Sequence, residues 1–210
     1  MNSFVSRSLI YVGGLFTLAL GVVLLINADV GIAPWDALYV ALSDQIGFTV
    51  GSWVFIVGGV LIFINSLIMM RKPNLAGFIP IVLLGLFVDL LNLKILSFIE
   101  VDGIVPRWIL FMVGIIIMGL GIAVYLHASL ASIPNDELML ALTEQTGWSI
   151  GITKTLTEAL AFVFAFILNG PIGAGTFVEV LLLGFLVGWF DKLIKKINHS
   201  SSSEPVVNHS

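Results

Sequence analysis

A few ionisable residues interrupt long apolar stretches of this sequence, and these are the residues that can do chemistry. Lys154 and Glu158 are four residues apart, so on a helix they share a face and can form an ion pair. Glu179 and Asp89 each stand within an apolar stretch. Charged groups inside membrane spans are costly and are functional candidates by default. They suit a gate or a proton-coupled site, and they suit a structural ion pair or an inert hydrogen bond equally.

Asp36 and Asp136 occupy matching places in two copies of one phrase. Residues 34–51 read PWDALYVALSDQIGFTVG and residues 134–151 read PNDELMLALTEQTGWSIG, with eight of eighteen positions identical and no gap. Proline suits the first turn of a helix, and Gly47 and Gly147 suit its end. Each copy therefore predicts a short helix of about three turns, too short to cross a bilayer.

The start of such a short helix can face a ligand. Its free N–H groups and partial positive charge suit an ion or proton site, and half-helices of this kind point at ligands in secondary transporters. Asp36 and Asp136 then mark two related sites. Alternatively, each carboxylate only satisfies its own helix terminus, or the two helices lie flat at the membrane interface as amphipathic segments.

The elements that position these residues are apolar helices. The chain has 210 residues, of which 59% are hydrophobic and 10% charged, whereas soluble domains have about 25% charged residues. Six stretches are long enough to cross a hydrocarbon core of about 30 Å. They are residues 8–27, 51–70, 76–97, 107–127, 150–169 and 173–193. We predict an all-α integral protein of the lipid bilayer, with one membrane domain over residues 1–198 and a disordered polar tail over residues 199–210.

The duplication extends beyond residues 34–51 and 134–151. Arg7 matches Arg107, Gly14 matches Gly114 and Gly21 matches Gly121, so residues 7–97 and 107–195 form two copies of one unit. Each unit holds three spans. Because three is odd, a non-crossing short helix makes the second copy inverted relative to the first, an architecture of secondary transporters. If the short helices crossed, the repeats would be parallel, but the charges within the phrases argue against crossing.

The basic residues near the span ends predict the orientation. With a cytoplasmic N-terminus, one set of basic residues lies inside: Arg7, Arg71, Lys72, Lys192, Lys195 and Lys196. Arg107 then lies outside, as an inverted copy of Arg7 should. We expect both termini in the cytoplasm.

Several kinds of function lack a sequence signal. The chain has no cysteine, no phosphate-binding glycine loop with lysine, no HExxH motif and no histidine cluster. We therefore expect no metal, no cofactor and no enzymatic activity. The formal charge of −4 argues against nucleic acid as a partner.

The stretch ADVGIAPWDALYVALSDQIGFTVGSW, residues 28–53, follows a glycine-rich first span and has a weaker second copy at residues 134–151. In these features the chain resembles the YczE/YyaS/YitT group of bacterial integral membrane proteins, and the YczE-like members most. The resemblance covers nearly the whole chain except the tail. It implies a location in the bacterial cytoplasmic (inner) membrane, and it supplies no catalytic residues.

The sequence favours a small secondary transporter, a permease-like protein with its site between two inverted repeats. The candidate residues for binding a small molecule or an ion are Asp36, Asp136, Lys154, Glu158, Glu179 and Asp89. Six spans are few for a transporter, so we expect a homodimer. The alternative is a non-transporting membrane partner of another complex, in which the interior carboxylates tolerate conversion to amides. A weaker third hypothesis is a membrane enzyme that acts on a lipid.

Overall fold

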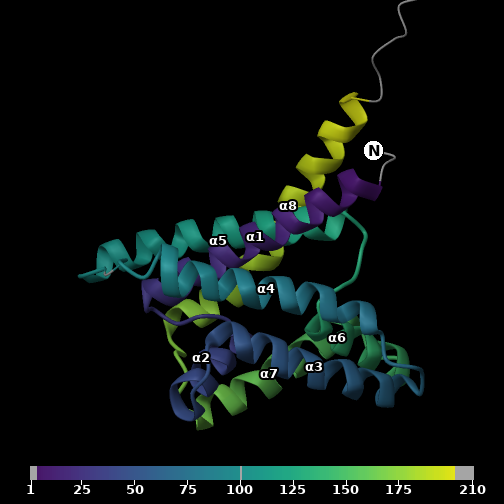
Figure 1. The fold of residues 1–210 in the computed structure, drawn as a ribbon, viewed down its shortest axis with the longest axis horizontal. Helices are drawn as coiled ribbons and strands as arrows, with labels where there is room; N and C mark the ends of the chain where they lie inside the picture. The colour runs from purple at the N-terminus through teal and green to yellow at the C-terminus, as the bar shows by residue number, and fades with distance from the viewer. Residues whose placement is uncertain (1–3, 100, 202–210) are drawn as a thin grey trace, which may run out of the picture.

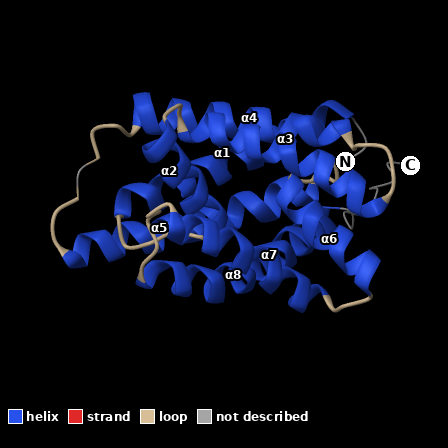
Figure 2. Ribbon diagram, turned by 90° about the horizontal axis from the view of Figure 1, so that it is seen from below, coloured by secondary structure: helices blue, strands red, loops and turns tan. Residues whose placement is uncertain are grey.

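The structure of the protein is a computed structural model that describes residues 4–99 and 101–201, and all regular secondary structure there is helical (Figure 2). The helices are α1 (Phe4–Ala28), α2 (Pro34–Ile46), α3 (Val50–Met69), α4 (Phe78–Leu90), α5 (Ile104–His127), α6 (Pro134–Thr146), α7 (Ile150–Ile167) and α8 (Ala174–Ser201). A 3₁₀ turn precedes α4 and a π-helical turn continues it, over Leu75–Gly77 and Leu91–Ile95.

Within the described residues, five helices are long and apolar enough to cross a membrane: Phe4–Ala28, Val50–Met69, Leu75–Ile95, Ile104–His127 and Ile150–Ile167. They coincide with five of the six predicted spans. The sixth predicted span, residues 173–193, lies in α8 except for its first residue, and α8 is outside that set. Because α8 continues to Ser201, residues 199–201 of the predicted tail are helical, and residues 202–210 lie outside the described part of the chain.

The two short helices form as predicted. Both α2 and α6 have 13 residues and begin at a proline. Each is closed by a glycine with positive φ, 97° at Gly47 and 70° at Gly147, a backbone conformation in which a side chain is strained. The following helices, α3 and α7, also start alike, because Thr49 and Ser149 each accept a bond from a backbone N–H of the first turn. The duplicated phrase therefore encodes one local structure twice.

Glycines at equivalent positions bring α1 and α5 into close contact. A Cβ atom added to Gly21 would lie 2.5 Å from the backbone nitrogen of Met118, and Gly121 lies against the backbone of Leu18. Small residues allow this approach of two membrane helices. The facing residue numbers rise along one helix as they fall along the other, so α1 and α5 run antiparallel.

Two equivalent arginines hold the ends of this helix pair. Arg7, in the first turn of α1, donates from Nε to the carbonyl of Ala128 at 3.0 Å, just beyond the end of α5. Arg107, in the first turn of α5, donates from Nη1 to the Asp29 carboxylate at 2.8 Å, just beyond the end of α1. Each arginine therefore ties the start of its own helix to the end of the equivalent helix in the other half.

The remaining helices pack in two groups (Figure 1). Helices α5 and α8 continue the layer that contains α1, while α2 packs on α7 and α6 packs on α3 in the other layer. Helix α4 joins the layers, since it contacts both α1 and α3. The start of α1 and the end of α8 lie at the same end of the molecule. Each short helix thus packs on a helix of the opposite half of the chain as well as on the helix that follows it.

Candidate functional site

A cavity of about 620 Å³ lies between the two helix layers. All the helices from α1 to α8 contribute to its wall. Most of the lining side chains are aliphatic or aromatic, such as Val22 of α1 and Ile122 of α5, and a minority are polar or charged. Pockets for small molecules have this size, about 300–1,000 Å³, and this composition.

Five of the six predicted site residues line this cavity: Asp36, Asp136, Lys154, Glu158 and Glu179. They come from α2, α6, α7 and α8, so they are distant in sequence and meet only in the fold. The prediction that these residues lie together between the halves agrees with this geometry.

Asp89 lies apart from the cavity and has a different environment. It accepts a hydrogen bond from the Thr49 hydroxyl at 2.5 Å and another from the backbone N–H of Gly51 at 2.9 Å. The carboxylate of Asp89 on α4 therefore binds the first turn of α3, where free N–H groups and the helix dipole favour an anion. This is the structural hydrogen bond that the sequence left as an alternative to a functional role.

The predicted ion pair on α7 is present. Lys154 Nζ lies 2.7 Å from Glu158 Oε1, and the accessible fractions of the two side chains are 50% and 16%. The second carboxylate oxygen of Glu158, Oε2, is buried and has no hydrogen-bond partner in the structure. The pair therefore leaves one acceptor unused at the cavity wall.

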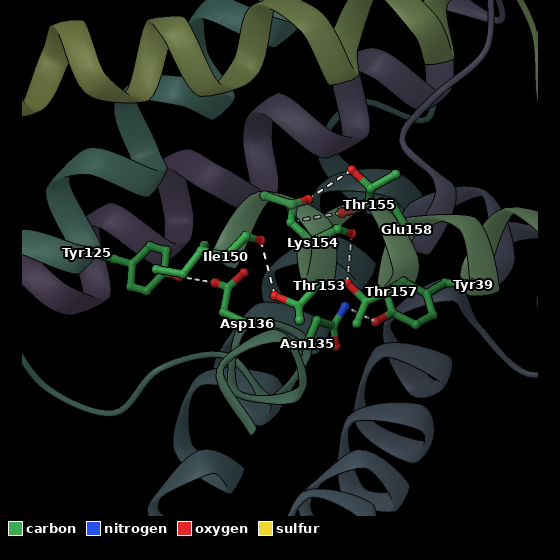
Figure 3. A network of polar contacts seen from close by, with 11 residues as sticks. Tyr39, Tyr125, Asn135, Asp136, Ile150, Thr153, Lys154, Thr155, Thr157 and Glu158 are labelled. Carbon is green, nitrogen blue, oxygen red and sulfur yellow. Dashed lines mark hydrogen bonds and ion pairs between the residues drawn. The ribbon is translucent and has the colours of Figure 1, made fainter. Parts of the chain in front are cut away.

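The two aspartates of the duplicated phrase differ in their contacts. Tyr125 of α5 donates a hydrogen bond to Asp136 Oδ2 at 3.1 Å (Figure 3). No side chain of an N-cap residue caps the start of α2 or α6, and both aspartates lie in the first turn of their helices. There a carboxylate is favoured by the helix dipole, so the alternative interpretation, in which each satisfies its own helix terminus, stays open. Asp36 lies on α2, which is not among the spanning helices. The pKa of Asp36 is raised to about 7, mainly by burial and then by the charge of Glu158, while the charge of Lys154 lowers it.

A contact between the two short helices adds residues that the sequence analysis missed. Asn135 Nδ2 of α6 donates to the Tyr39 hydroxyl of α2 at 2.8 Å (Figure 3). The other amide atom, Asn135 Oδ1, is buried and unpartnered. Trp35 lines the same wall. Spacing could have found Tyr39, because it lies one helical turn after Asp36 and so shares its face; nothing in the sequence links Tyr125 to Asp136.

Glu179 is the most buried of the cavity acids. Its accessible fraction is 0%, and neither carboxyl oxygen has a hydrogen-bond partner. The backbone amide of Ala33, at the start of α2, lies close by but outside hydrogen-bond geometry. A buried carboxyl group without partners costs free energy, so Glu179 is the cavity residue whose unpaired atoms most need an explanation.

Comparison with known proteins settles the family. Residues 5–192 match the "Family of unknown function (DUF6198)". The chain belongs to this family. It is similar to "Uncharacterized protein YyaS" of Bacillus subtilis (strain 168), with 36% identity over 183 residues that cover 87% of this chain and 91% of the relative. It is also similar to "Uncharacterized membrane protein YczE" of the same strain, with 34% identity over 184 residues that cover 87% of this chain and 84% of the relative.

A more distant relative is an "Uncharacterized protein" of Haemophilus influenzae (strain ATCC 51907 / DSM 11121 / KW20 / Rd), 26% identical over 182 residues that cover 87% of this chain and 82% of the relative. No solved structure matches the chain. The predicted resemblance to YczE and YyaS is confirmed, and the printed name of YczE agrees with the apolar helices of this chain in indicating a membrane protein.

Proposed function

We propose that this protein is a small secondary transporter of the bacterial cytoplasmic membrane, in which two inverted halves give alternating access to the central cavity. Six helices cross the bilayer in this proposal, α1, α3, α4, α5, α7 and α8, while α2 and α6 enter it from opposite sides. Both termini are cytoplasmic, in keeping with the basic residues near the span ends. The cavity holds the transported small molecule or ion.

Contacts between the halves support the inverted arrangement. Helices α1 and α5 are repeat mates and run antiparallel, as the glycine contacts at Gly21 and Gly121 require. Arg7 and Arg107 make equivalent bonds at opposite ends of this pair. Helices α2 and α6 also lie toward opposite ends of the molecule (Figure 1). Repeats related in this way, with a site between them, are typical of secondary transporters.

One difference between the halves carries the proposal. In the first half, Gly51 of α3 lies against Gly85 of α4, so close that a Cβ atom on Gly85 would be 2.5 Å from the Gly51 carbonyl oxygen. Their counterparts in the second half, Gly151 of α7 and Gly184 of α8, have nothing within 4 Å of an added Cβ. One helix pair is closed and its equivalent is open.

This difference supports alternating access for a physical reason. Two halves with the same local design have similar packing preferences, so each helix pair can adopt the closed or the open arrangement. If closing one pair opens the other, the cavity is exposed to the two sides of the membrane in turn. Gly184 lines the cavity, so the open pair α7–α8 forms its present boundary.

Distances across both helix pairs test the proposal. Ile56 of α3 and Val82 of α4 are exposed, and so are their repeat mates Leu156 of α7 and Leu181 of α8. Because the native chain has no cysteine, the double variants I56C/V82C and L156C/L181C accept spin labels at these positions alone. Double electron–electron resonance in lipid nanodiscs, from acid to alkaline pH, then gives the two distances. Each pair serves as the matched control for the other.

We expect both pairs to show one short and one long distance in complementary proportions, with the first pair mainly short and the second mainly long. A shift in one pair should accompany the opposite shift in the other. Fixed single distances in both pairs under all conditions would exclude alternating access. The chain would then fit the non-transporting membrane partner better.

A further inference from the structure

The unpaired groups of the cavity indicate what it binds. Four carboxyl groups line it, those of Asp36, Asp136, Glu158 and Glu179, against the single ammonium of Lys154. The formal charge of the lining is −3 when all four acids are ionised, four negative charges against one positive, and −2 when Asp36 is protonated. Charges in a cavity with low-dielectric walls attract ions of opposite sign, so the cavity favours a cation over an anion. The positive starts of the short helices would by themselves favour an anion, and the acidic side chains around them reverse that preference.

The unsatisfied atoms call for hydrogen-bond donors. The buried and unpartnered atoms of the cavity wall are both carboxyl oxygens of Glu179, Oε2 of Glu158 and Oδ1 of Asn135. The carboxylate oxygens are acceptors when ionised, and the amide oxygen of Asn135 is an acceptor because its nitrogen donates to Tyr39. A ligand with several N–H groups would satisfy atoms from three different helices, α6, α7 and α8.

The geometry favours an organic cation over a metal ion. Among the described residues, no group of three or more His, Cys, Asp or Glu side chains is arranged to hold a metal. The acids are spread around the wall, and one oxygen of Asp136 is already bonded to Tyr125. Most of the wall is apolar, and it includes Trp35, whose side chain is of the type that attracts cations most strongly. A ligand with a charged nitrogen and an apolar body matches all of these features.

The chain itself contains an example of such a group in this cavity. The side chain of Lys154 is a four-carbon chain that ends in a primary ammonium, and this ammonium binds Glu158 at 2.7 Å. This ion pair places an alkylammonium beside a carboxylate at the cavity wall. A second alkylammonium would meet the same chemistry at Glu179, where both oxygens are unused.

We infer that the ligand of the central cavity is a small alkylammonium, a protonated amine with an apolar body, which binds Glu179 and Oε2 of Glu158 while Lys154 acts as a built-in competitor. This inference rests on the proposed function, because it names the substrate class of the same cavity. It requires no covalent step. Protonated amines of this kind include n-butylammonium, which has the same chain and charged group as lysine.

Calorimetric titration of the purified full chain in lipid nanodiscs tests the inference with three probes of similar size: n-butylammonium, n-butanol and butyrate. We expect saturable binding of n-butylammonium alone. The alcohol controls for partition into lipid, since it has the same apolar chain. Glu179→Gln should weaken n-butylammonium binding at least tenfold. Asp89→Asn, which changes a carboxylate outside the cavity, should leave the dissociation constant unchanged. If E179Q does not fold, Glu158→Gln serves the same purpose.

Binding of butyrate, equal binding of all three probes, or no saturable binding would overturn the inference. So would unchanged affinity in a folded E179Q variant. Uptake of n-butylammonium into proteoliposomes separates this failure from that of the proposed function. Saturable binding without uptake contradicts transport and leaves the ligand class standing. Uptake of butyrate without uptake of the amine contradicts the ligand class and leaves transport standing.

Discussion

The ammonium of Lys154 lies 2.7 Å from the Glu158 carboxylate, and this ion pair lines the wall of the central cavity. Such a pair can be purely structural, or its lysine can occupy the carboxylate to which a cationic ligand binds. The two roles differ in what happens when the lysine is removed. A structural pair contributes to stability alone, whereas a competing lysine lowers the affinity for a cation.

We expect Lys154→Met to bind n-butylammonium more tightly, on the order of tenfold, because Oε1 of Glu158 becomes available and one positive charge leaves the cavity. Lys195→Met is the matched control. Lys195 also forms an i,i+4 ion pair, 2.6 Å from Asp191, and neither residue lines the cavity. Titration calorimetry of both variants measures the effect. Equal affinities for K154M, K195M and the native chain would assign Lys154 a structural role.

The raised pKa of Asp36 predicts a dependence of stability on pH. The folded pKa is about 7 against an ordinary value of 3.8, so between these values the folded state holds a proton that the unfolded state releases. The free energy of unfolding therefore falls as pH rises from about 4 to 7, by up to about 1.4 kcal/mol per pH unit from this group. Asp36→Asn should make the slope shallower in chemical unfolding curves. An unchanged slope would contradict an Asp36 that is protonated in the folded state at neutral pH.

The charged residues around Asp36 determine the pH at which its proton is released. Glu158 and Lys154 face it from α7, Glu179 of α8 lies close enough to interact with its charge, and Tyr39 lies one turn along its own helix. The charge of Glu158 is the second cause of the raised Asp36 pKa, after burial, and Glu158→Gln removes it. It should therefore shift the pH-dependent step toward lower pH, whereas Lys154→Met should shift it toward higher pH.

The α1–α5 contact predicts opposite outcomes for two glycines of one helix. Gly21→Ala would place a methyl group within about 2.5 Å of the backbone of Met118, and overpacking of this kind costs about 1–3 kcal/mol. Gly13→Ala is the control, because nothing lies within 4 Å of its added Cβ. In thermal unfolding in detergent, G21A should have a lower melting temperature than the native chain, and G13A should have nearly the same one. Equal melting temperatures would contradict the close helix crossing.

Asp89 should affect stability and not ligand binding. Asp89→Ala removes charge-assisted hydrogen bonds to Thr49 and Gly51, with an expected loss of about 2–3 kcal/mol. Glu144→Ala removes an exposed ion pair with Arg71 and should cost less than about 1 kcal/mol. Unfolding curves measure both. A folded D89A variant with normal stability and weakened amine binding would return Asp89 to the list of site candidates.

Much of the fold could be predicted from the sequence, since apolar length and a duplicated phrase are local signals. Pro34 and Gly47 mark the ends of a short helix, and their counterparts a hundred residues later mark the same helix again. The ion pair of Lys154 and Glu158 was predictable for the same reason, because four residues on one helix fix its geometry.

Contacts between helices that are distant in the sequence could not be predicted from local sequence patterns. Asp89 and Glu179 look alike in sequence, as single acids in apolar stretches, yet one binds the start of α3 and the other faces the cavity without a partner. Tyr125 becomes part of the site only because α5 passes beside α6. The repeat also gave no sign that α3–α4 is closed while α7–α8 is open, because the same glycines occur in both copies.

The central claim is that the two halves are inverted, and side-specific labelling of two equivalent residues tests it most directly. Phe48 and Trp148 are repeat mates, and both are exposed beside the turns that follow α2 and α6. F48C and W148C provide single thiols in a chain without cysteine. A membrane-impermeant maleimide should label F48C in intact cells and W148C only in inverted vesicles. Labelling of both from the same side would contradict the inverted architecture and the alternating cavity that depends on it.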